Sequence, residues 1–274
     1  MKTWTVLRIN CDCASYLWLR EREPSGNHFP RCKFCRKSLG DLEWKQVGKI
    51  KADTELEAMQ IHKDQQKLRM HFINLLDRVS KNLDISVLES IYGLVQQKYS
   101  EKHRAYHNLS HLQFCLDLFE ESHRQAADPD AVELALWYHD LFYDPQRHDN
   151  EMWSAAAAVT DGERLKVNYR LICKTKRLIL ATQHRKSSYE GDEAVIVDLD
   201  LAILGADREK FLAYEDGIRK EYSFVPVAIF KEKRAEILEG FLARKTIFNT
   251  PYFRKKFESK ARENLRFSIN LLRE

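Results

Sequence analysis

Residues 128–140 read DPDAVELALWYHD, and this stretch decides the fold class. Asp128 followed by Pro129 is typical of a helix start, because the acidic side chain caps free backbone amides and proline at the first helical position needs no amide hydrogen. Apolar residues then recur at helical spacing up to the adjacent pair His139 and Asp140. The stretch predicts an apolar helix that carries a histidine and a carboxylate inside it.

The same helical period continues along most of the chain from Leu68 onward. A helix is expected to start at the capping box Thr54–Glu57, and one long helix or two helices extend from there to about Leu83. We therefore expect a mainly α fold in which an all-helical bundle spans residues 67–274. Beyond residues 128–140, further helices are expected at about 167–184, 192–204, 207–222, 226–244 and 251–272.

Residues 1–66 have a different character. Short strands are expected at 3–9, 16–20 and 43–51, because apolar and β-branched residues there are separated by turn signals rich in Gly, Pro, Asn and Asp. We interpret this part as a small β-rich module in front of the helical domain.

Four of the six cysteines lie in this module, as the pairs Cys11-x-Cys13 and Cys32-x-x-Cys35. Two close thiolate pairs match a tetrahedral structural zinc site, although one pair is C-x-C rather than C-x-x-C, and His28 is an alternative donor. A segment this short has little core, so a metal ion would help to hold it together. The sequence predicts a zinc-ribbon-like module and leaves its role open between folding, docking and partner binding.

Composition limits the function classes. The formal net charge is only +4, which argues against a dedicated nucleic-acid binder and fits a small anionic substrate. No apolar run resembles a signal peptide or a membrane span, so we expect a soluble, cytoplasmic protein without a membrane partner. The two remaining cysteines, Cys115 and Cys173, lie on apolar stripes and are predicted to be buried thiols. The oligomeric state stays open.

Two more pairs join His139 and Asp140 as candidate metal ligands. His107 and His111 are spaced i and i+4, which places them on one face if the segment is helical. Asp198 and Asp200 interrupt an apolar run, where a carboxylate is costly unless it is paired or binds metal. If residues 192–204 form a helix, as we favour, the two aspartates lie about 200° apart and only one faces the site; in a strand, both would share a face.

In this order, the motifs resemble the HD superfamily of metal-dependent phosphohydrolases, in particular a bacterial and phage branch, over roughly residues 68–274. The matching stretches are Tyr106-His107-Asn108 with His111, Trp137-Tyr138-His139-Asp140 with Tyr143-Asp144-Pro145, Asp149-Asn150-Glu151 with Ser154-Ala155, Ala181-Thr182 with His184, Asp198-Leu199-Asp200-Leu201 with Ile203-Leu204-Gly205, and Ile218-Arg219 with Glu221-Tyr222.

The resemblance implies that His111, His139, Asp140 and one of the two aspartates bind a divalent metal, and related motifs favour Asp200 over Asp198. Imidazole and carboxylate donors together suit Mn, Fe, Co, Ni or Zn, and Mg is also compatible. The Tyr-His-Asn-x-x-His pattern is similar to that of cyclic-nucleotide phosphodiesterases, in which the first histidine protonates the leaving group.

That similarity makes His107 the proposed general acid and His111 the ligand. The reverse assignment stays open, because other members have an Arg-x-x-His pattern that Arg104 and His107 also satisfy. Arg104 and His184 are candidates for contacting the substrate, and Glu151 is a candidate for base assistance.

The implied activity is hydrolysis of a phosphate ester or anhydride in a nucleotide-like substrate by metal-activated water, which Asp140 would help to orient. Two other classes stay open. One is a di-iron oxygenase of the same fold, for which His148 and His184 would be the additional ligands. The other is a non-catalytic, nucleotide-binding regulatory module, against which the complete ligand set argues.

Overall fold

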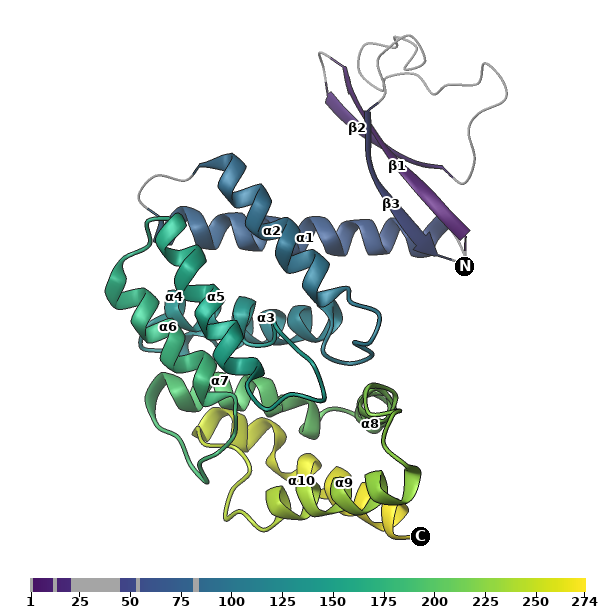
Figure 1. Cartoon of the computed structure of the whole chain (residues 1–274), viewed down its shortest axis with the longest axis vertical. Helices are drawn as coiled ribbons and strands as arrows, with labels where there is room; N and C mark the ends of the chain where they lie inside the picture. Colours follow the sequence, from purple (N-terminus) through teal and green to yellow (C-terminus); the bar gives the residue numbers. More distant parts are fainter. Residues whose placement is uncertain (1, 12–13, 21–44, 53–54, 81–83) are drawn as a thin grey trace. The chain divides into compact units, whose positions relative to one another are not determined.

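The computed structural model of the chain describes residues 2–11, 14–20, 45–52, 55–80 and 84–274. The described chain divides into two compact units, Met1–His71 and Phe72–Glu274. The boundary falls inside helix α1, Glu55–Val79, which is shared by the two units (Figure 1). The region that could hold one helix or two is therefore a single helix, and the next helix begins only at Ile85.

The first unit contains a three-stranded antiparallel sheet with the order β2-β1-β3. Its strands are β1 (Lys2–Cys11), β2 (Ala14–Arg20) and β3 (Lys45–Ala52). Trp4 and Val6 alternate along β1 and are buried with Ile50 and Ala52 of β3. The Trp4 indole also donates a hydrogen bond to the Ala52 carbonyl oxygen at 3.2 Å. A small apolar cluster thus covers one face of the described sheet.

The predicted zinc site lies outside the described part of the chain. Cys13, Cys32, Cys35 and His28 belong to segments that the structure does not describe, and Cys11 is described only as the last backbone position of β1. The zinc-ribbon-like character of residues 1–66 therefore stays a prediction.

The second unit is helical, which confirms the mainly α fold. Its helices are α2 (Ile85–Tyr99), α3 (Leu109–Ser122), α4 (Pro129–Tyr138), α5 (Asn150–Arg164), α6 (Tyr169–Ala181), α7 (Gly191–Leu201), α8 (Arg208–Glu221), α9 (Val227–Leu242) and α10 (Pro251–Arg273). Short 3-10 turns follow α3 and α7, at His123–Gln125 and Ala202–Gly205. None of the described helices is long and apolar enough to cross a membrane.

Side-chain caps explain why these helices begin where they do. The Asp128 carboxylate accepts a hydrogen bond from the Ala131 amide at 3.2 Å, directly before Pro129 at the start of α4. The Asn108 side chain accepts one from the Ser110 amide at 2.9 Å and starts α3. The predicted start of α4 is confirmed.

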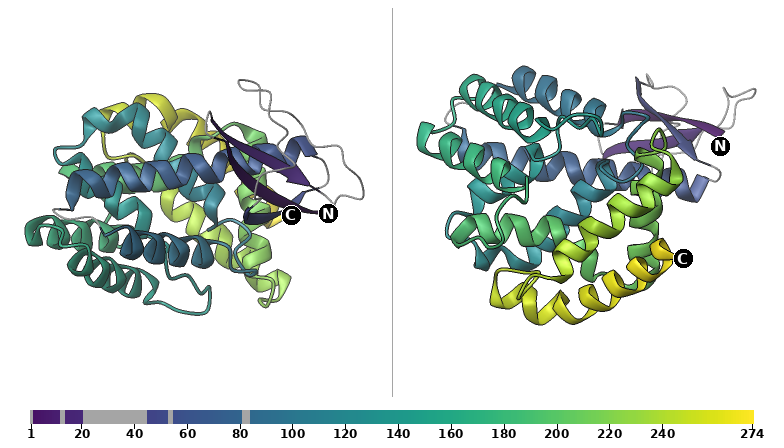
Figure 2. Two further views of the ribbon diagram at one scale, coloured as in Figure 1. Left: turned by 90° about the horizontal axis from the view of Figure 1, so that it is seen from above. Right: turned by 60° about the horizontal axis from the view of Figure 1, so that its bottom comes forward.

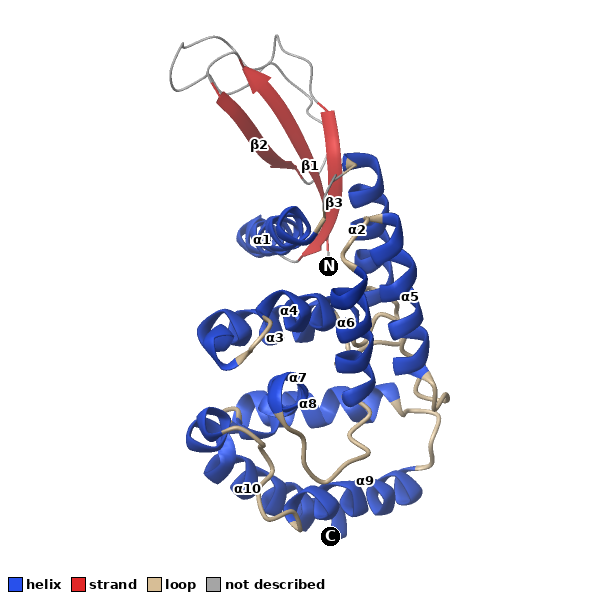
Figure 3. Ribbon diagram, turned by 90° about the vertical axis from the view of Figure 1, so that its left-hand side faces the viewer, coloured by secondary structure: helices blue, strands red, loops and turns tan. Residues whose placement is uncertain are grey.

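Helix α4 lies at the centre of the bundle, and nearly all of its side chains are buried. The Trp137 ring packs against Phe72 and Tyr92, with centroids 4.8 and 6.5 Å away. Helix α4 contacts α3, α6 and α7. In Figure 3, α3 and α4 form one level, α7 lies at the next, and α9 and α10 close the far end.

The C-terminal helices complete the bundle on the side of α7. Helix α10 runs along α9 and packs on the turn Ala202–Gly205, as the yellow and yellow-green helices of Figure 2 show. A side chain at Gly205 would place its Cβ 2.6 Å from the Cβ of Phe257, so only glycine permits this approach. The close contact holds the end of α7, and with it Asp200, against α10.

Three local predictions were wrong. His107 precedes α3 and is not on the helix that carries His111. Helix α4 ends at Tyr138, so His139 and Asp140 lie in the turn that follows it. Cys173 is exposed on α6, whereas Cys115 is buried as predicted.

Candidate metal centre

Four donor side chains from three neighbouring segments converge in the helical unit. His111 lies in the first turn of α3, His139 and Asp140 lie in the turn after α4, and Asp200 lies in the last turn of α7. Because α3, α4 and α7 contact one another, residues far apart in the sequence reach one point. Each of the four offers a ligand atom, and these atoms all lie within 4.8 Å of one another.

The donor separations match the edges of a single coordination sphere. The Nε2 atoms of His111 and His139 are 3.1 Å apart, and Asp140 Oδ2 lies 3.5 and 3.2 Å from them. Asp200 Oδ1 lies 3.4 and 3.8 Å from the same two nitrogens. Ligand atoms bound about 2.0–2.2 Å from one shared ion lie about 2.8–3.1 Å apart in octahedral and about 3.3–3.6 Å apart in tetrahedral geometry. Only the separation of 3.8 Å between Asp200 Oδ1 and His139 Nε2 exceeds these ranges. These four residues therefore fit a divalent transition metal.

Burial gives a second reason to expect a cation. Both imidazole side chains are fully buried, and only 16% of each carboxylate side chain is exposed. Asp140 Oδ2 is buried and accepts no hydrogen bond of normal geometry from the described residues, although it faces His139 Nε2 at 3.2 Å. A buried carboxylate oxygen left in this way is costly, and a bound cation would satisfy it.

The pKa shifts show that the cluster favours positive charge. Burial lowers the pKa of His139, but Asp140 and Asp200 more than offset this and raise it to about 9. Burial likewise lowers the pKa of His111, yet Cys115, Tyr106 and the two carboxylates raise it well above its ordinary value. Burial raises the pKa values of Asp140 and Asp200, but the neighbouring histidines hold both below their usual range.

Further hydrogen bonds orient the donors. His139 Nδ1 lies 2.7 Å from the Leu136 carbonyl oxygen, to which it donates, so its Nε2 lone pair faces the cluster. His184 Nε2 contacts Asp200 Oδ2 at 2.9 Å, which leaves Oδ1 toward His111 and His139. His184 has a φ of 54°, a backbone conformation that costs energy for a non-glycine residue. The site thus retains a strained residue beside Asp200.

Asp198 lies elsewhere, which corrects the alternative that it binds the metal. It accepts hydrogen bonds from the Asn249 amide, the Asn249 side chain and the Thr250 amide at 2.7, 2.9 and 2.7 Å. Burial raises the pKa of Asp198 against the lowering effect of these donors. Because α7 is helical, Asp198 and Asp200 point in different directions, as the helical reading of this segment predicted.

His107 stands beside the cluster and is held by a carboxylate. Its ring centroid lies 5.9 Å from that of His111, and its Nδ1 lies 2.7 Å from Glu221 Oε2. Glu221 Oε1 also accepts hydrogen bonds from the amides of Tyr106 and His107, at 2.7 and 2.9 Å. Tyr143 donates its hydroxyl to Glu221 Oε2 at 2.8 Å and stacks on the His107 ring at 4.1 Å. Nε2 is therefore the nitrogen of His107 left to meet a ligand.

Glu221 was not among the predicted site residues. The only sequence signal for it was its place in the stretch Glu221-Tyr222, one of those that carry the family resemblance. It lies at the end of α8, more than a hundred positions beyond His107, and its side chain is fully buried.

Arg104, a candidate for contacting the substrate, is engaged with the protein itself. Its side chain is fully buried and donates hydrogen bonds to the carbonyl oxygens of His107, Asp140 and Leu141 at 3.1, 2.6 and 2.8 Å. It also contacts Glu101 Oε2 at 3.1 Å. Arg104 thus ties the segment before α3 to the turn after α4, which positions His107 and Asp140 together.

The remaining candidates lie outside the four-donor cluster. Glu151 lies in the first turn of α5, half-buried, where Gln183 donates a hydrogen bond to it at 3.4 Å. His148 is exposed in the loop before α5. The structure brings neither to the metal centre, so the predicted base role of Glu151 finds no geometric counterpart there.

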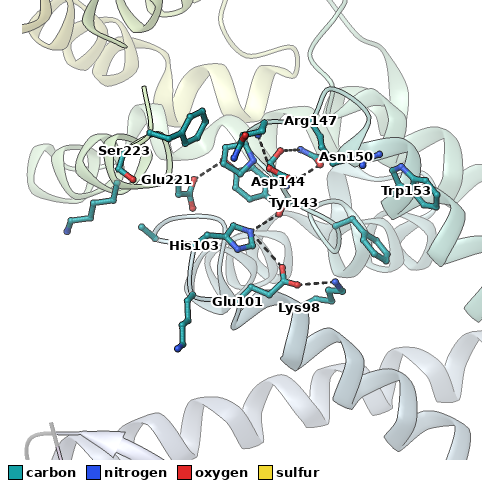
Figure 4. Close-up of a pocket in the computed structure, with 17 residues that line it drawn as sticks. Lys98, Glu101, His103, Tyr143, Asp144, Arg147, Asn150, Trp153, Glu221 and Ser223 are labelled. Atoms are coloured by element: carbon teal, nitrogen blue, oxygen red, sulfur yellow. Dashed lines mark hydrogen bonds and ion pairs between the residues drawn. The ribbon is translucent and has the colours of Figure 1, made fainter. Parts of the chain in front are cut away.

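Two cavities adjoin the His107 side of the site. The first, of about 710 Å³, reaches Asp200, His184 and His107 and is bordered by α8 and α9. The second, of about 890 Å³, contains Tyr143 and Glu221 and is shown in Figure 4. Of its lining residues, Lys98 pairs with Glu101 at 3.0 Å, and Arg147 pairs at 2.7 Å with Asp149, which lies outside the lining. The first cavity is the one that opens onto a candidate ligand.

No family model, no curated protein and no solved structure matches this chain.

Proposed function

We propose that this chain is a metal-dependent phosphohydrolase of the HD type, which hydrolyses a phosphate ester or anhydride. The observation that carries the proposal is the convergence of His111, His139, Asp140 and Asp200, with separations that suit one ion. A cavity beside this cluster gives a substrate access to it.

The donor chemistry limits the metal. Two imidazole nitrogens with two carboxylates favour Mn, Fe, Co, Ni or Zn over Mg, which prefers oxygen donors and water. A divalent ion held there would lower the pKa of a coordinated water and offset negative charge on the phosphoryl oxygens.

The protein residues then have separate roles. His107 would give a proton from Nε2 to the leaving oxygen, because Nδ1 is engaged by Glu221. Glu221 and Tyr143 fix the plane of the His107 ring, so the donor is oriented before a substrate arrives. Arg104 donates hydrogen bonds to the backbone of both His107 and Asp140 and so ties the proposed acid to the proposed metal ligand.

The oxygenase alternative has less support in the described chain. It requires additional histidine ligands, and His148 is exposed away from the cluster while His184 is engaged with Asp200. The other donor group found, His111, Cys115 and His139, shares both histidines with the first and therefore describes the same position.

The test combines metal analysis with a phosphate-release screen. Full-length protein is reconstituted separately with Mn, Co, Ni, Zn and Mg and offered nucleotides and simple phosphate esters. His139→Ala and Asp140→Ala should each abolish activity and lower the metal content by one ion per chain. His123→Ala, an exposed histidine after α3, is the matched control and should leave both unchanged.

Because all variants keep the N-terminal cysteines, any zinc bound there contributes equally to the metal content measured for each variant. Full metal retention by both site variants would refute the ligand assignment. Bound iron with a visible absorption band, together with no phosphate release from any substrate, would favour the oxygenase.

A further inference from the structure

The 710 Å³ cavity is lined by both polar and apolar side chains. Asp200, His184 and His107 line it next to the candidate metal centre. Its apolar lining comes from Ile229, Phe230, Ile237 and Phe241 of α9, together with Ile203 and Ile218, and the Phe241 ring lies 6.3 Å from that of His184. A ligand that fills this cavity therefore meets polar groups at the candidate metal centre and apolar side chains of α9.

Two apolar side chains of this wall are about half exposed to solvent in the described structure. Ile229 and Ile237 are 50% and 51% exposed, and they lie two helical turns apart on α9 with Lys233 between them. Isolated exposed apolar residues are common, but these two both line a cavity whose wall also holds Phe230 and Phe241. A ligand that covered them would remove this surface from water.

The two cations of this wall each have a carboxylate partner. Arg234 is buried and pairs with Glu215 while donating to the Tyr214 hydroxyl, and Lys233 forms an exposed pair with Glu236 at 2.9 Å. Beyond the metal centre, Lys233 is therefore the one Lys or Arg of the described lining that is open to a second phosphate group. One phosphoryl group at the metal and an uncharged group beyond it fit this distribution of charge.

We propose that the substrate is a phosphate monoester of an apolar alcohol, whose hydrocarbon part lies against α9. This proposal depends on the hydrolytic function above and names its substrate class. In the reaction, the oxygen of one water molecule bonds to phosphorus while the bond from phosphorus to the alcohol oxygen breaks. His107 gives its proton to the alcohol oxygen, and the proton lost by the water restores His107. The products are inorganic phosphate and the free alcohol.

The experiment separates the apolar site from the hydrolysis. Binding of 1-naphthol to the full chain without added metal is measured by calorimetry, because the alcohol needs no metal ion. Hydrolysis of 1-naphthyl phosphate, AMP and glycerol 2-phosphate is then compared in the metal-loaded protein. Ile229→Asn and Ile237→Asn test the wall, and Leu271→Asn, at a 46% exposed position on α10, is the matched control.

We expect the naphthyl ester to have the lowest KM of the three substrates. Each wall variant should weaken naphthol binding and raise the KM for the naphthyl ester about five- to tenfold, as expected for roughly half of one isoleucine side chain removed from water. The control should change neither, and the KM for glycerol 2-phosphate should stay the same in all variants. The replaced residues are half-exposed, so the variants are expected to fold.

Other results would overturn the proposal. Preference for AMP over the naphthyl ester, with no effect of the wall variants, would keep the hydrolase and refute the apolar substrate. Naphthol binding that depends on the wall residues, without phosphate release from any ester, would support the apolar site and refute the hydrolase. A concentration-dependent dimer that both wall variants disrupt, without naphthol binding, would show that a second chain covers this surface.

Discussion

At the scale of single residues, the site separates two histidines that the sequence placed together. His111 lies with three other donors, whereas His107 is held by Glu221 and stays outside the donor group. We therefore expect the replacement of His111 to affect metal binding and the replacement of His107 to affect the reaction rate.

His111→Ala should lower metal occupancy, because the cluster loses a buried nitrogen donor. His107→Ala should keep the metal but lose about 10²–10⁴-fold in rate on a substrate with a poor leaving group, which is the usual range for a general acid. A nitrophenyl ester needs little protonation of its leaving group and should be affected much less. Metal content and kcat for both ester types are the measurements. If His107→Ala lacks the metal while His111→Ala retains it, His107 is the ligand and His111 is the general acid.

Glu221 should make the stability of the protein depend on pH in acid. Burial raises the pKa of Glu221, but its hydrogen bonds with His107 and the backbone amides outweigh this, so the pKa lies below its ordinary value of 4.5. The ionised form is thus stabilised in the folded state, and this contribution is present above pH 4.5 and lost as the pH falls through the lowered pKa. The free energy of unfolding, measured from pH 7 to pH 3, should therefore fall less steeply for Glu221→Gln than for the wild type.

Parallel curves for the two proteins would show that Glu221 has the same pKa in the folded and unfolded states. Glu236→Gln, which removes an exposed carboxylate of α9, is the control and should follow the wild-type curve.

At the scale of elements, α7 carries two aspartates with opposite tasks. Asp198 holds the segment Asn249–Thr250 at the start of α10, and Asp200 faces the donor cluster. The Thr250 side chain in turn accepts a hydrogen bond from the Phe253 amide and caps α10. One face of α7 therefore holds the C-terminal helix, and the other contributes to the candidate metal centre.

Asp198→Ala should lower the free energy of unfolding by about 3 kcal/mol, because two backbone amides and one side-chain amide would lose their buried acceptor. Its metal content per folded chain should not change. Asp200→Ala should instead lose the metal from the folded chain. Urea denaturation and metal analysis of the two variants measure both effects. Loss of metal from folded Asp198→Ala would mean that α7 orients the site through α10.

Helices α3 and α6 show why apolar periodicity alone did not predict which side chains are buried. Cys115 and Cys173 both lie on stripes of helical spacing, yet only Cys115 is covered, by His111 and the Leu199 carbonyl at 3.8–3.9 Å. A stripe marks the face that can be buried, but the neighbouring elements decide how wide the buried face is.

At the scale of the whole molecule, the chain contains two units whose stabilities have different sources. The helical unit has an extensive aromatic and aliphatic core around α4, whereas the apolar cluster of the described sheet consists of Trp4, Val6, Ile50 and Ala52. The prediction that residues 1–66 need a metal ion stays a prediction, because Cys13, Cys32 and Cys35 lie outside the described residues.

We expect one tightly bound zinc per chain in residues 1–66, held by Cys11, Cys13, Cys32 and Cys35. Native mass spectrometry of the full chain should show it, and Cys32→Ser or Cys35→Ser should release it and abolish the ordered signals of the sheet in NMR spectra. Cys173→Ser, an exposed cysteine of the helical unit, is the control and should retain the zinc. Disulfides found by thiol titration of a reduced preparation would contradict the zinc assignment.

The sequence by itself determined the helical class, most helix bounds and the residue types of the candidate site. Capping residues and apolar period are local, so Asp128-Pro129 identified the start of α4, and the expected helix at 251–272 appears as Pro251–Arg273. The helical reading of residues 192–204 also implied that only one of Asp198 and Asp200 could face the site.

Only the tertiary structure decided which groups meet. Glu221 contacts His107 across 114 positions of sequence, and Asp198 accepts hydrogen bonds from Asn249 across 51. The Arg104 guanidinium donates its hydrogen bonds to carbonyl oxygens 3 to 37 positions away. The apolar wall of α9 faces Asp200 only because α7, α8 and α9 fold around one cavity. Local periodicity specifies which face of a helix is apolar, but the partner of that face depends on how separate helices pack, and no short stretch of sequence contains that information.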